Sequence, residues 1–291
     1  MRRLGTSASL ASLGSLVVVL SALLVGCGGD AAAGGSPSAA QPVALNVFAA
    51  ASLKDAFTAI GNSFHTAHPN VTVTFNFAGS DTLAQQITQG GAPADIFASA
   101  NAAQMNVVVK GGDIDGGKVK VFTHNRIEVI FPKSNPAHIQ SLQDLARPGL
   151  KLVLAAPAVP AGQYARDFLT RAGNDAPFPA GYKDAVLKNV VSSESDVKSV
   201  LAKVALGEAD AGIVYTTDAA AQVSALGTLA IPDNLNTIAV YPIGVVKGSK
   251  QAATAQQFVD AVLATDGQTT LARFGFLPAS QGPQYTPPAG A

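Results

Sequence analysis

The feature that most constrains the fold is a junction in which a short apolar strand runs through small residues into a helix. The stretch Leu45–Asp55 (LNVFAAASLKD) is the first example, with three alanines between its apolar residues and its helix. Ser52 stands three residues before Asp55, which predicts that Ser52 is the N-cap of that helix. From Leu53 to Phe64 the apolar residues recur at helical spacing. The junction therefore predicts a strand–helix unit of an α/β protein.

Alternating strands and helices continue along the rest of the chain. Further strands are predicted at 71–77, 94–99, 150–155, 189–191, 211–215 and 239–246, with two extended pieces within 120–131. Further helices are predicted at 81–89, 101–110, 141–146, 251–264 and 268–274, with one carrying Tyr164–Ala172 and one opened by Glu194–Asp196. This order favours two α/β lobes, each a mostly parallel sheet flanked by helices, joined by two crossover strands. The expected division is lobe 1 at 43–124 and 240–281, lobe 2 at 125–239, and a C-terminal tail at 282–291.

The first 26 residues have the layout of a secretory signal peptide. Arg2 and Arg3 precede an apolar run that ends in Leu24-Val25-Gly26-Cys27. This ending resembles the bacterial lipobox, so we expect residues 1–26 to be removed and Cys27 to carry lipid. A transmembrane anchor is the less favoured alternative, because the run is shorter than the roughly 20 residues that a spanning helix needs. Residues 27–42 then predict a flexible linker, which would tether an extracytoplasmic body to the outer face of the cell membrane.

Composition excludes several classes of function. Only 13% of the residues are charged and the formal net charge is zero, so no basic surface for nucleic acid is expected. A single cysteine cannot form an internal disulfide. Neither a metal site nor a cofactor is expected, because the four histidines follow no metal-ligand spacing and the calcium-like start Asp113–Gly116 lacks the remaining ligands. The histidines are expected at the surface: His65, His68, His124 and His138.

Four predicted turns place small or hydroxylated residues where a strand feeds a helix. They contain Ser52, Ser80, Ala161-Gly162 and Ser195–Val197, and Ser80, like Ser52, is expected at the N-cap of the helix that follows it. In a parallel sheet such turns share the carboxyl edge, where the free N–H groups and the dipole of each helix favour an anion. No lysine or arginine stands inside these turns except Lys54, one step into its helix, which predicts binding by neutral donors. Asp81 follows Ser80 directly and is expected to point outward.

Several motifs together resemble the molybdate-binding proteins of bacterial ABC importers, which are type II periplasmic binding proteins. The matching pieces lie between about 45 and 277 and are VFAAASL, FAGSDTLAQQI, GAPADIF, VPAGQYA, SESDV, GIVYTTDA, YPIGVV and RFGF. The resemblance implies that molybdate, and tungstate with it, is held between two closing lobes and passed to a membrane permease with its ATPase. It implies hydroxyl and backbone donors at Ser52 and Ser80, backbone N–H groups at Ala161 and Val197, and the phenol of Tyr215. A monomer that is not an enzyme is expected.

Two other classes of function stay open at this point. A hydrolase could use Ser52 or Ser80 as nucleophile, but no histidine lies in the turns and no Gly-x-Ser-x-Gly elbow is present. A protein for sulfate, another oxyanion or an organic solute could use the same scaffold. An organic acid would call for a carboxylate clamp, yet the candidate arginines lie outside the turns: Arg126, Arg147, Arg166 and Arg171.

Overall fold

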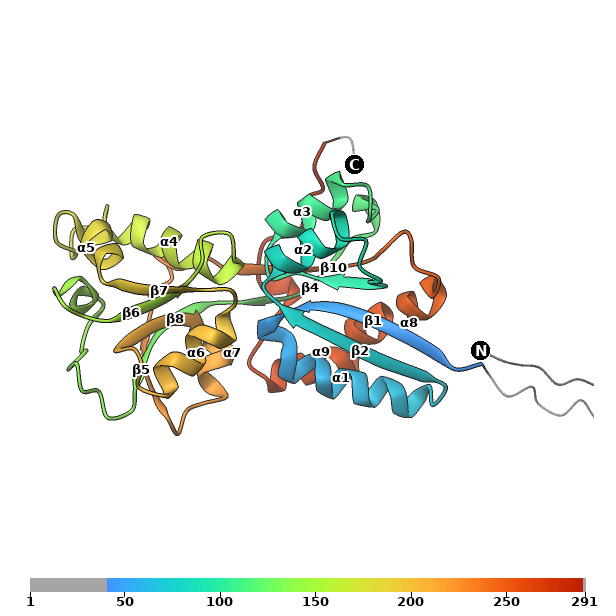
Figure 1. Cartoon of the computed structure of the whole chain (residues 1–291), viewed down its shortest axis with the longest axis horizontal. Helices are drawn as coiled ribbons and strands as arrows, with labels where there is room; N and C mark the ends of the chain where they lie inside the picture. Colours follow the sequence, from blue (N-terminus) through green and yellow to red (C-terminus); the bar gives the residue numbers. More distant parts are fainter. Residues whose placement is uncertain (1–40, 290–291) are drawn as a thin grey trace, which may run out of the picture. The chain divides into compact units, whose positions relative to one another are not determined.

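The computed structural model describes residues 41–289. The predicted signal peptide, Cys27 and nearly all of the linker lie outside the described residues. Within 41–289 the chain forms two mixed sheets, each flanked by helices (Figure 1). This confirms the prediction of a two-lobed α/β fold.

The first sheet has six strands in the order β11-β4-β10-β3-β1-β2. Strands β1 and β2 pair in parallel, as do β1 and β3, whereas β10 and β11 pair antiparallel to their neighbours. The bounds are β1 Val43–Ala50, β2 Val71–Ala78, β3 Ile96–Ala98, β4 Lys120–Asn125, β10 Ala239–Val245 and β11 Leu277–Pro278. Predicted strands 71–77 and 239–246 are therefore confirmed, and the one predicted at 94–99 is shorter than expected.

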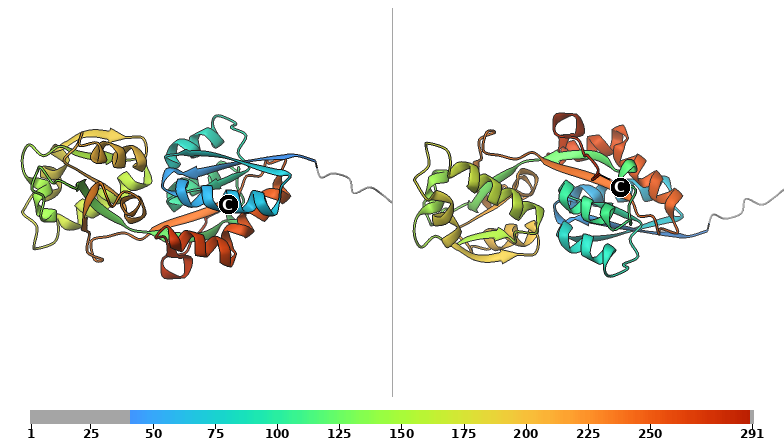
Figure 2. Two further views of the ribbon diagram at one scale, coloured as in Figure 1. Left: turned by 90° about the horizontal axis from the view of Figure 1, so that it is seen from below. Right: turned by 90° about the horizontal axis from the view of Figure 1, so that it is seen from above.

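Helices cover both faces of this sheet (Figure 2). Helix α1 (Lys54–Ala67) packs with α8 (Ala252–Leu263) and α9 (Thr265–Arg273), and their core includes Phe57 and Phe258. Helices α2 (Ser80–Thr88) and α3 (Ala102–Lys110) pack together in a separate apolar cluster with residues such as Phe97. Strand β3 and the carboxyl half of β1 are fully buried because both faces of the sheet are covered there.

The second sheet has five strands in the order β7-β6-β8-β5-β9. Strand β6 is parallel to β7 and β8, while β5 is antiparallel to β8 and β9. The strand bounds are β5 Ile127–Pro132, β6 Leu152–Ala155, β7 Val190–Glu194, β8 Ala211–Tyr215 and β9 Leu226–Ala230. The helices are α4 Pro160–Ala172, α5 Tyr182–Lys188, α6 Val197–Ala205 and α7 Thr216–Ala220.

Two chain crossings join the sheets. Each one adds a strand that pairs antiparallel with its neighbours, β5 in the second sheet and β10 in the first. Strand β4 continues into β5 through Arg126 alone, and the chain returns from β9 to β10. Ala239 pairs with Asn125 next to the first crossing, so the two connections run side by side there (Figure 2). The placement of the lobe boundaries at 124/125 and 239/240 stays a prediction.

Several local predictions were wrong or incomplete. Ser52 is not an N-cap: it lies inside a 3₁₀ turn, Ala51–Leu53, whose N-cap is Ala50, and α1 begins only at Lys54. Ser80 is the first residue of α2, and its N-cap is Gly79. The helix predicted at 141–146 is a 3₁₀ turn, Leu142–Ala146. Sequence patterns missed α5, α7 and β9, which are short and carry little periodicity.

The expectation that all four histidines lie at the surface is wrong for His124. Its side chain is fully buried on β4, with Nδ1 3.2 Å from the carbonyl oxygen of Pro278 and Nε2 2.9 Å from that of Pro283. Residues from the predicted tail therefore pack on lobe 1. Tyr285 in this segment also donates a hydrogen bond to Asn106 Oδ1 at 2.7 Å.

Candidate functional site

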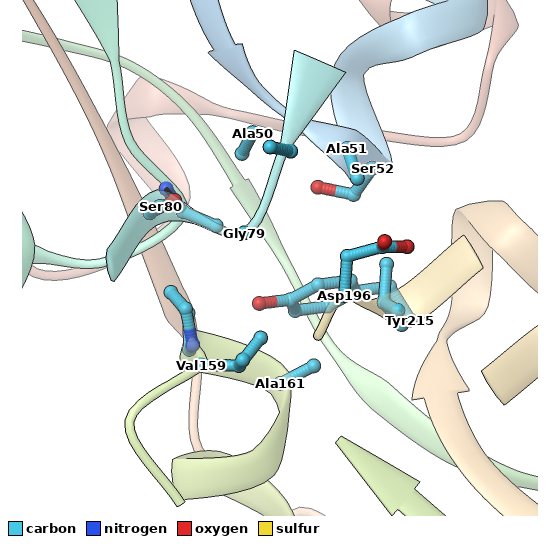
Figure 3. A pocket seen from close by; sticks show the side chains of 13 residues that line it. Ala50, Ala51, Ser52, Gly79, Ser80, Val159, Ala161, Asp196 and Tyr215 are labelled. Atoms are coloured by element: carbon cyan, nitrogen blue, oxygen red, sulfur yellow. Dashed lines mark hydrogen bonds between the residues drawn. The ribbon is translucent and has the colours of Figure 1, made fainter. Parts of the chain in front are cut away.

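A small cavity lies where strand ends from both sheets meet (Figure 3). Its wall consists of residues 50–52 after β1, 78–80 after β2, Ala100 beyond β3, 159–161 at the start of α4, 196–197 at the start of α6, and Tyr215 at the end of β8. The wall thus includes all five residues that the resemblance singled out. Strand ends and helix starts meet here because the crossovers of parallel strands place every such junction at the carboxyl edge.

Polar contacts between the lobes surround the cavity. Asn101 Nδ2 donates to Gln163 Oε1 at 3.1 Å, and Tyr164 Oη donates to the carbonyl oxygen of Ala100 at 3.2 Å. Gln104 Nε2 donates to the carbonyl oxygen of Ala158 at 3.1 Å. These bonds join α3 and the β3–α3 turn to α4 and the turn before it, so they hold the two sides of the cavity together.

Ser52 presents its hydroxyl to the cavity from the 3₁₀ turn after β1 (Figure 3). It is buried, and its Oγ lies 2.9 Å from the hydroxyl oxygen of Tyr241 on β10. A serine that capped its own helix would accept from backbone N–H groups two or three residues ahead. Ser52 makes the contact with Tyr241 instead, which leaves the first N–H groups of the turn without side-chain partners.

Ser80 is the first helical residue of α2 and is almost fully buried. Its Oγ accepts a hydrogen bond from the backbone N–H of Ala100 at 3.0 Å. This contact links the starts of α2 and α3 and explains why Ser80 does not cap its own helix. The hydroxyl proton remains free to donate, since Oγ is only an acceptor in that bond.

Lobe 2 contributes backbone N–H groups at Ala161 and Val197. Pro160 occupies the first turn of α4, where its missing N–H costs nothing, and Ala161 follows it. Val197 is the first residue of α6, whose N-cap Asp196 accepts from Ser199 N at 3.0 Å. N–H groups in a helix's first turn have no partner within the helix. Both are therefore donors at the wall of the cavity.

Tyr215 is the clearest sign of a ligand site. Its side chain is only 1% exposed, and its hydroxyl has no hydrogen-bond partner among residues 41–289. Burial, followed by the influence of Tyr241, raises the pKa of Tyr215 well above its ordinary value, so the phenol keeps its proton. In Figure 3 the hydroxyl points into the cavity. A buried donor without an acceptor costs about 1–3 kcal/mol, which a bound acceptor would recover.

The cavity wall carries little charge. No lysine or arginine lines it within the described part of the chain, and its one acid, Asp196, is engaged by the backbone and hydroxyl of Ser199. Asp81 does not line the cavity, although its Oδ1 is buried and finds no partner in residues 41–289. Such a wall offers hydrogen-bond donors without a balancing cation, which suits an anion that carries no proton of its own.

Two glycines allow the backbones to approach one another at this site. A Cβ on Gly79 would lie 2.5 Å from the carbonyl oxygen of Ser195, which belongs to the other lobe. A Cβ on Gly162 would lie 2.0 Å from the carbonyl oxygen of Ala156. The sequence patterns place Gly162 in a predicted turn and Gly79 and Tyr241 only within matching motifs. They do not mark Ala100, because backbone approach and contacts across distant strands leave no local pattern.

The chain belongs to the family of bacterial extracellular solute-binding proteins, whose model matches residues 45–277. It is 40% identical over 277 residues to the molybdate-binding protein ModA of Mycobacterium tuberculosis, covering 95% of this chain and 99% of that protein. The family is defined by solute binding and not by catalysis, and its members act outside the cytoplasm.

Solved structures share this architecture. The substrate-binding domain of a putative molybdenum ABC transporter from Clostridium difficile is 31% identical, with a TM-score of 0.59 over 81% of this chain and 99% of that one. The periplasmic molybdate-binding protein of Azotobacter vinelandii, 18% identical, has a TM-score of 0.69 over 80% and 98% of the two chains. At 18% identity, the similarity to the Azotobacter vinelandii protein supports a shared fold alone.

Two kinds of feature are absent from the described residues. Residues 41–289 contain no group of three or more His, Cys, Asp or Glu side chains placed to hold a metal ion. In the same span, every helix is too short or too polar to cross a membrane.

Proposed function

We propose that this chain captures molybdate, together with tungstate, in the cavity between its lobes and delivers it to an ABC permease with its ATPase. The ligand contacts would be the hydroxyls of Ser52, Ser80 and Tyr215 and the backbone N–H groups of Ser52, Ser80, Ala161 and Val197. The observation that carries the proposal is the buried Tyr215 hydroxyl, which lacks a partner in residues 41–289 and faces a wall of donors. The names of the similar proteins supply the choice of molybdate among oxyanions.

Physical chemistry favours an unprotonated oxyanion for such a wall. Helix starts supply N–H groups and the positive end of the helix dipole from both lobes. Every proposed contact is a donor, so an anion that carries a proton would leave that proton facing another donor. A buried donor left facing a proton costs about 1–3 kcal/mol, which is a preference of roughly five- to 150-fold.

Domain closure would couple capture to transport. Contacts come from both lobes, so the anion would stabilise the form in which the lobes are together. The crossings at 125–127 and 231–239 would supply the hinge. We further propose that Cys27 carries the lipid that anchors the protein to the outer face of the membrane, and that the protein acts as a monomer.

Calorimetric titration of the mature chain with molybdate, tungstate, sulfate and hydrogen phosphate tests the proposal. Molybdate and tungstate should bind tightly with one site per chain, and hydrogen phosphate should not compete. Tight sulfate binding without a preference for molybdate would assign the protein to a different importer. Binding of an amino acid or another organic solute, with no oxyanion bound, would refute the proposal.

A further inference from the structure

The hydroxyl of Ser52 has a fixed neighbour behind it. Tyr241 is fully buried on β10, and its Oη lies 2.9 Å from Ser52 Oγ, although the two residues are 189 positions apart. Tyr241 does not line the cavity. It therefore stands one layer behind a proposed ligand contact.

The direction of this hydrogen bond decides what Ser52 can offer a ligand. A serine hydroxyl has one proton. If Ser52 gave that proton to Tyr241, only oxygen lone pairs would face the cavity, and these repel an oxyanion. If Tyr241 is the donor, the Ser52 proton is free to turn to the cavity.

Burial favours Tyr241 as the donor. Its side chain is fully buried, and Ser52 Oγ is the one hydrogen-bond partner of its hydroxyl within residues 41–289. If Tyr241 only accepted, its own proton would be buried without an acceptor, which is costly. Burial also raises the pKa of Tyr241 well above its ordinary value, so the phenol keeps the proton that it donates.

Aromatic packing holds the Tyr241 ring in place. Its centroid lies 5.6 Å from that of Phe276, 5.9 Å from that of Tyr215 and 6.2 Å from that of Phe122, each pair near edge-to-face or tilted. The hydroxyl oxygen therefore has little freedom to leave Ser52. Removing only the hydroxyl would keep this packing.

Building on the proposed function, we propose that Tyr241 is a positioning residue that makes Ser52 a hydrogen-bond donor to the bound anion and thereby favours anions without a proton. Tyr241 donates to Ser52 Oγ, and Ser52 donates to the ligand. Without Tyr241, Ser52 can rotate and accept a proton from the ligand.

The Tyr241→Phe variant tests this role. Relative to the unaltered chain, its molybdate affinity should fall about tenfold, the loss of one good hydrogen bond. Displacement of molybdate by sulfate and by hydrogen phosphate then gives the selectivity. These anions are similar in size and differ by one proton, so their ratio of dissociation constants should move toward one.

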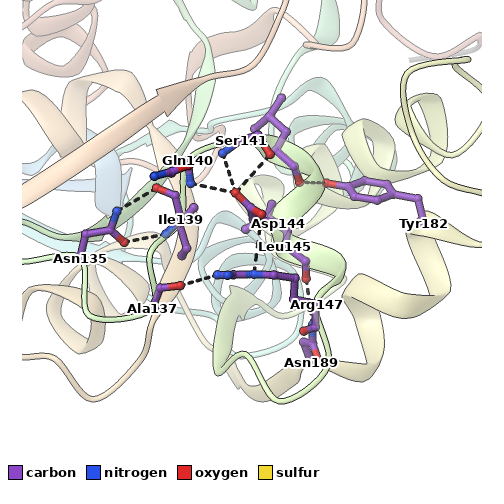
Figure 4. A network of polar contacts seen from close by, with 11 residues as sticks. Asn135, Ala137, Ile139, Gln140, Ser141, Asp144, Leu145, Arg147, Tyr182 and Asn189 are labelled. Carbon is purple, nitrogen blue, oxygen red and sulfur yellow. Dashed lines mark hydrogen bonds and ion pairs between the residues drawn. The ribbon is translucent and has the colours of Figure 1, made fainter.

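A double-mutant cycle distinguishes an effect of Tyr241 that passes through Ser52 from a general disturbance of the fold. In a Ser52→Ala background, Tyr241→Phe should change molybdate affinity less than twofold, because its effect passes through Ser52. Tyr182→Phe is the matched control, since Tyr182 is equally buried but donates to the carbonyl oxygen of Leu142, away from the cavity (Figure 4). It should leave affinity and selectivity unchanged.

Each outcome supports or overturns the role of Tyr241. An equal loss from Tyr241→Phe in both backgrounds, or an unchanged sulfate-to-phosphate ratio, would overturn the role of Tyr241 and leave the proposed function standing. No molybdate binding by the unaltered chain would overturn the proposed function and the Tyr241 role with it.

Discussion

The ammonium group of Lys198, on α6, lies 2.9 Å from Asp55 Oδ2 on α1 and 3.0 Å from Asp218 Oδ1 on α7. Asp55 belongs to the helices of the first sheet and Asp218 to those of the second, so Lys198 joins the two. Burial by itself would lower the pKa of Lys198, but the two carboxylates raise it overall, which keeps the ammonium charged. Asp218 is fully buried, and burial raises its pKa to about 6 against the opposing effect of Lys198.

The Lys198–Asp55 pair is expected to favour the form in which the lobes are together. Asp55→Asn removes the partner across the lobes and leaves the Lys198–Asp218 pair intact. Both groups are partly exposed, so the pair is worth about 0.5 kcal/mol, or two- to threefold in affinity. Stopped-flow measurement should show the loss mainly as faster anion release, and the difference should shrink at high salt.

Asp184→Asn is the control for this prediction, because Asp184 is exposed and forms no ion pair within residues 41–289. It should leave the release rate unchanged. A release rate for Asp55→Asn equal to that of this control would show that the pair plays no part in closure.

Gly79 is expected to be required for closure. A methyl group there would meet the carbonyl oxygen of Ser195 at 2.5 Å, while the backbone of Gly79 (φ −57°, ψ 137°) is open to alanine. Gly79→Ala should therefore fold normally but lose at least about tenfold in anion affinity, since the methyl group wedges the lobes apart. Calorimetric titration measures the anion affinity, and the melting temperature without ligand shows whether the variant folds normally. Wild-type affinity in Gly79→Ala would refute close approach of these backbones in the bound state.

Tyr215→Phe should weaken anion binding while stabilising the free protein. The variant removes a buried hydroxyl that has no partner in residues 41–289, so the free chain should gain about 1 kcal/mol in unfolding free energy. Anion affinity should fall about tenfold because one donor is lost. Chemical denaturation with and without molybdate measures both. A variant that loses stability without ligand would show that the hydroxyl is already satisfied.

The carboxyl group of Glu128 predicts how the stability of the folded protein depends on pH. Burial on β5 raises the pKa of this carboxyl to about 7, from an ordinary value of 4.5. The folded state therefore holds the proton more tightly than the unfolded chain, and stability falls as pH rises from about 4.5 to about 7. Glu128→Gln should be more stable than the unaltered chain at pH 8, by about 1–2 kcal/mol after allowance for partial exposure, and equal to it near pH 4. An equal difference in stability between Glu128→Gln and the unaltered chain at both pH values would contradict a raised pKa of Glu128 as the cause.

The fold can be predicted from the sequence because its signal is periodic. Parallel pairing of β1 with β2 and β3, and the crossover helices α1 to α3, follow from apolar spacing and small-residue turns that are visible locally. The five proposed contact residues lie together because strand–helix junctions lie at the carboxyl edge of each sheet and these two edges meet at the cavity. By contrast, the caps predicted at Ser52 and Ser80 fail because distant groups, Tyr241 Oη and Ala100 N, engage those hydroxyls instead. Tertiary contacts of this kind have no counterpart in local sequence.

The most direct test of the proposed function is a crystal structure with tungstate, whose metal is located by anomalous scattering. A single peak should lie in the cavity between Ser52 and Tyr215, with anion oxygens at hydrogen-bond distance from Ser52 and Ser80 Oγ, the N–H groups of Ala161 and Val197, and Tyr215 Oη. A peak elsewhere on the protein, or an anion held by a lysine or arginine side chain, would contradict binding by neutral donors in this cavity.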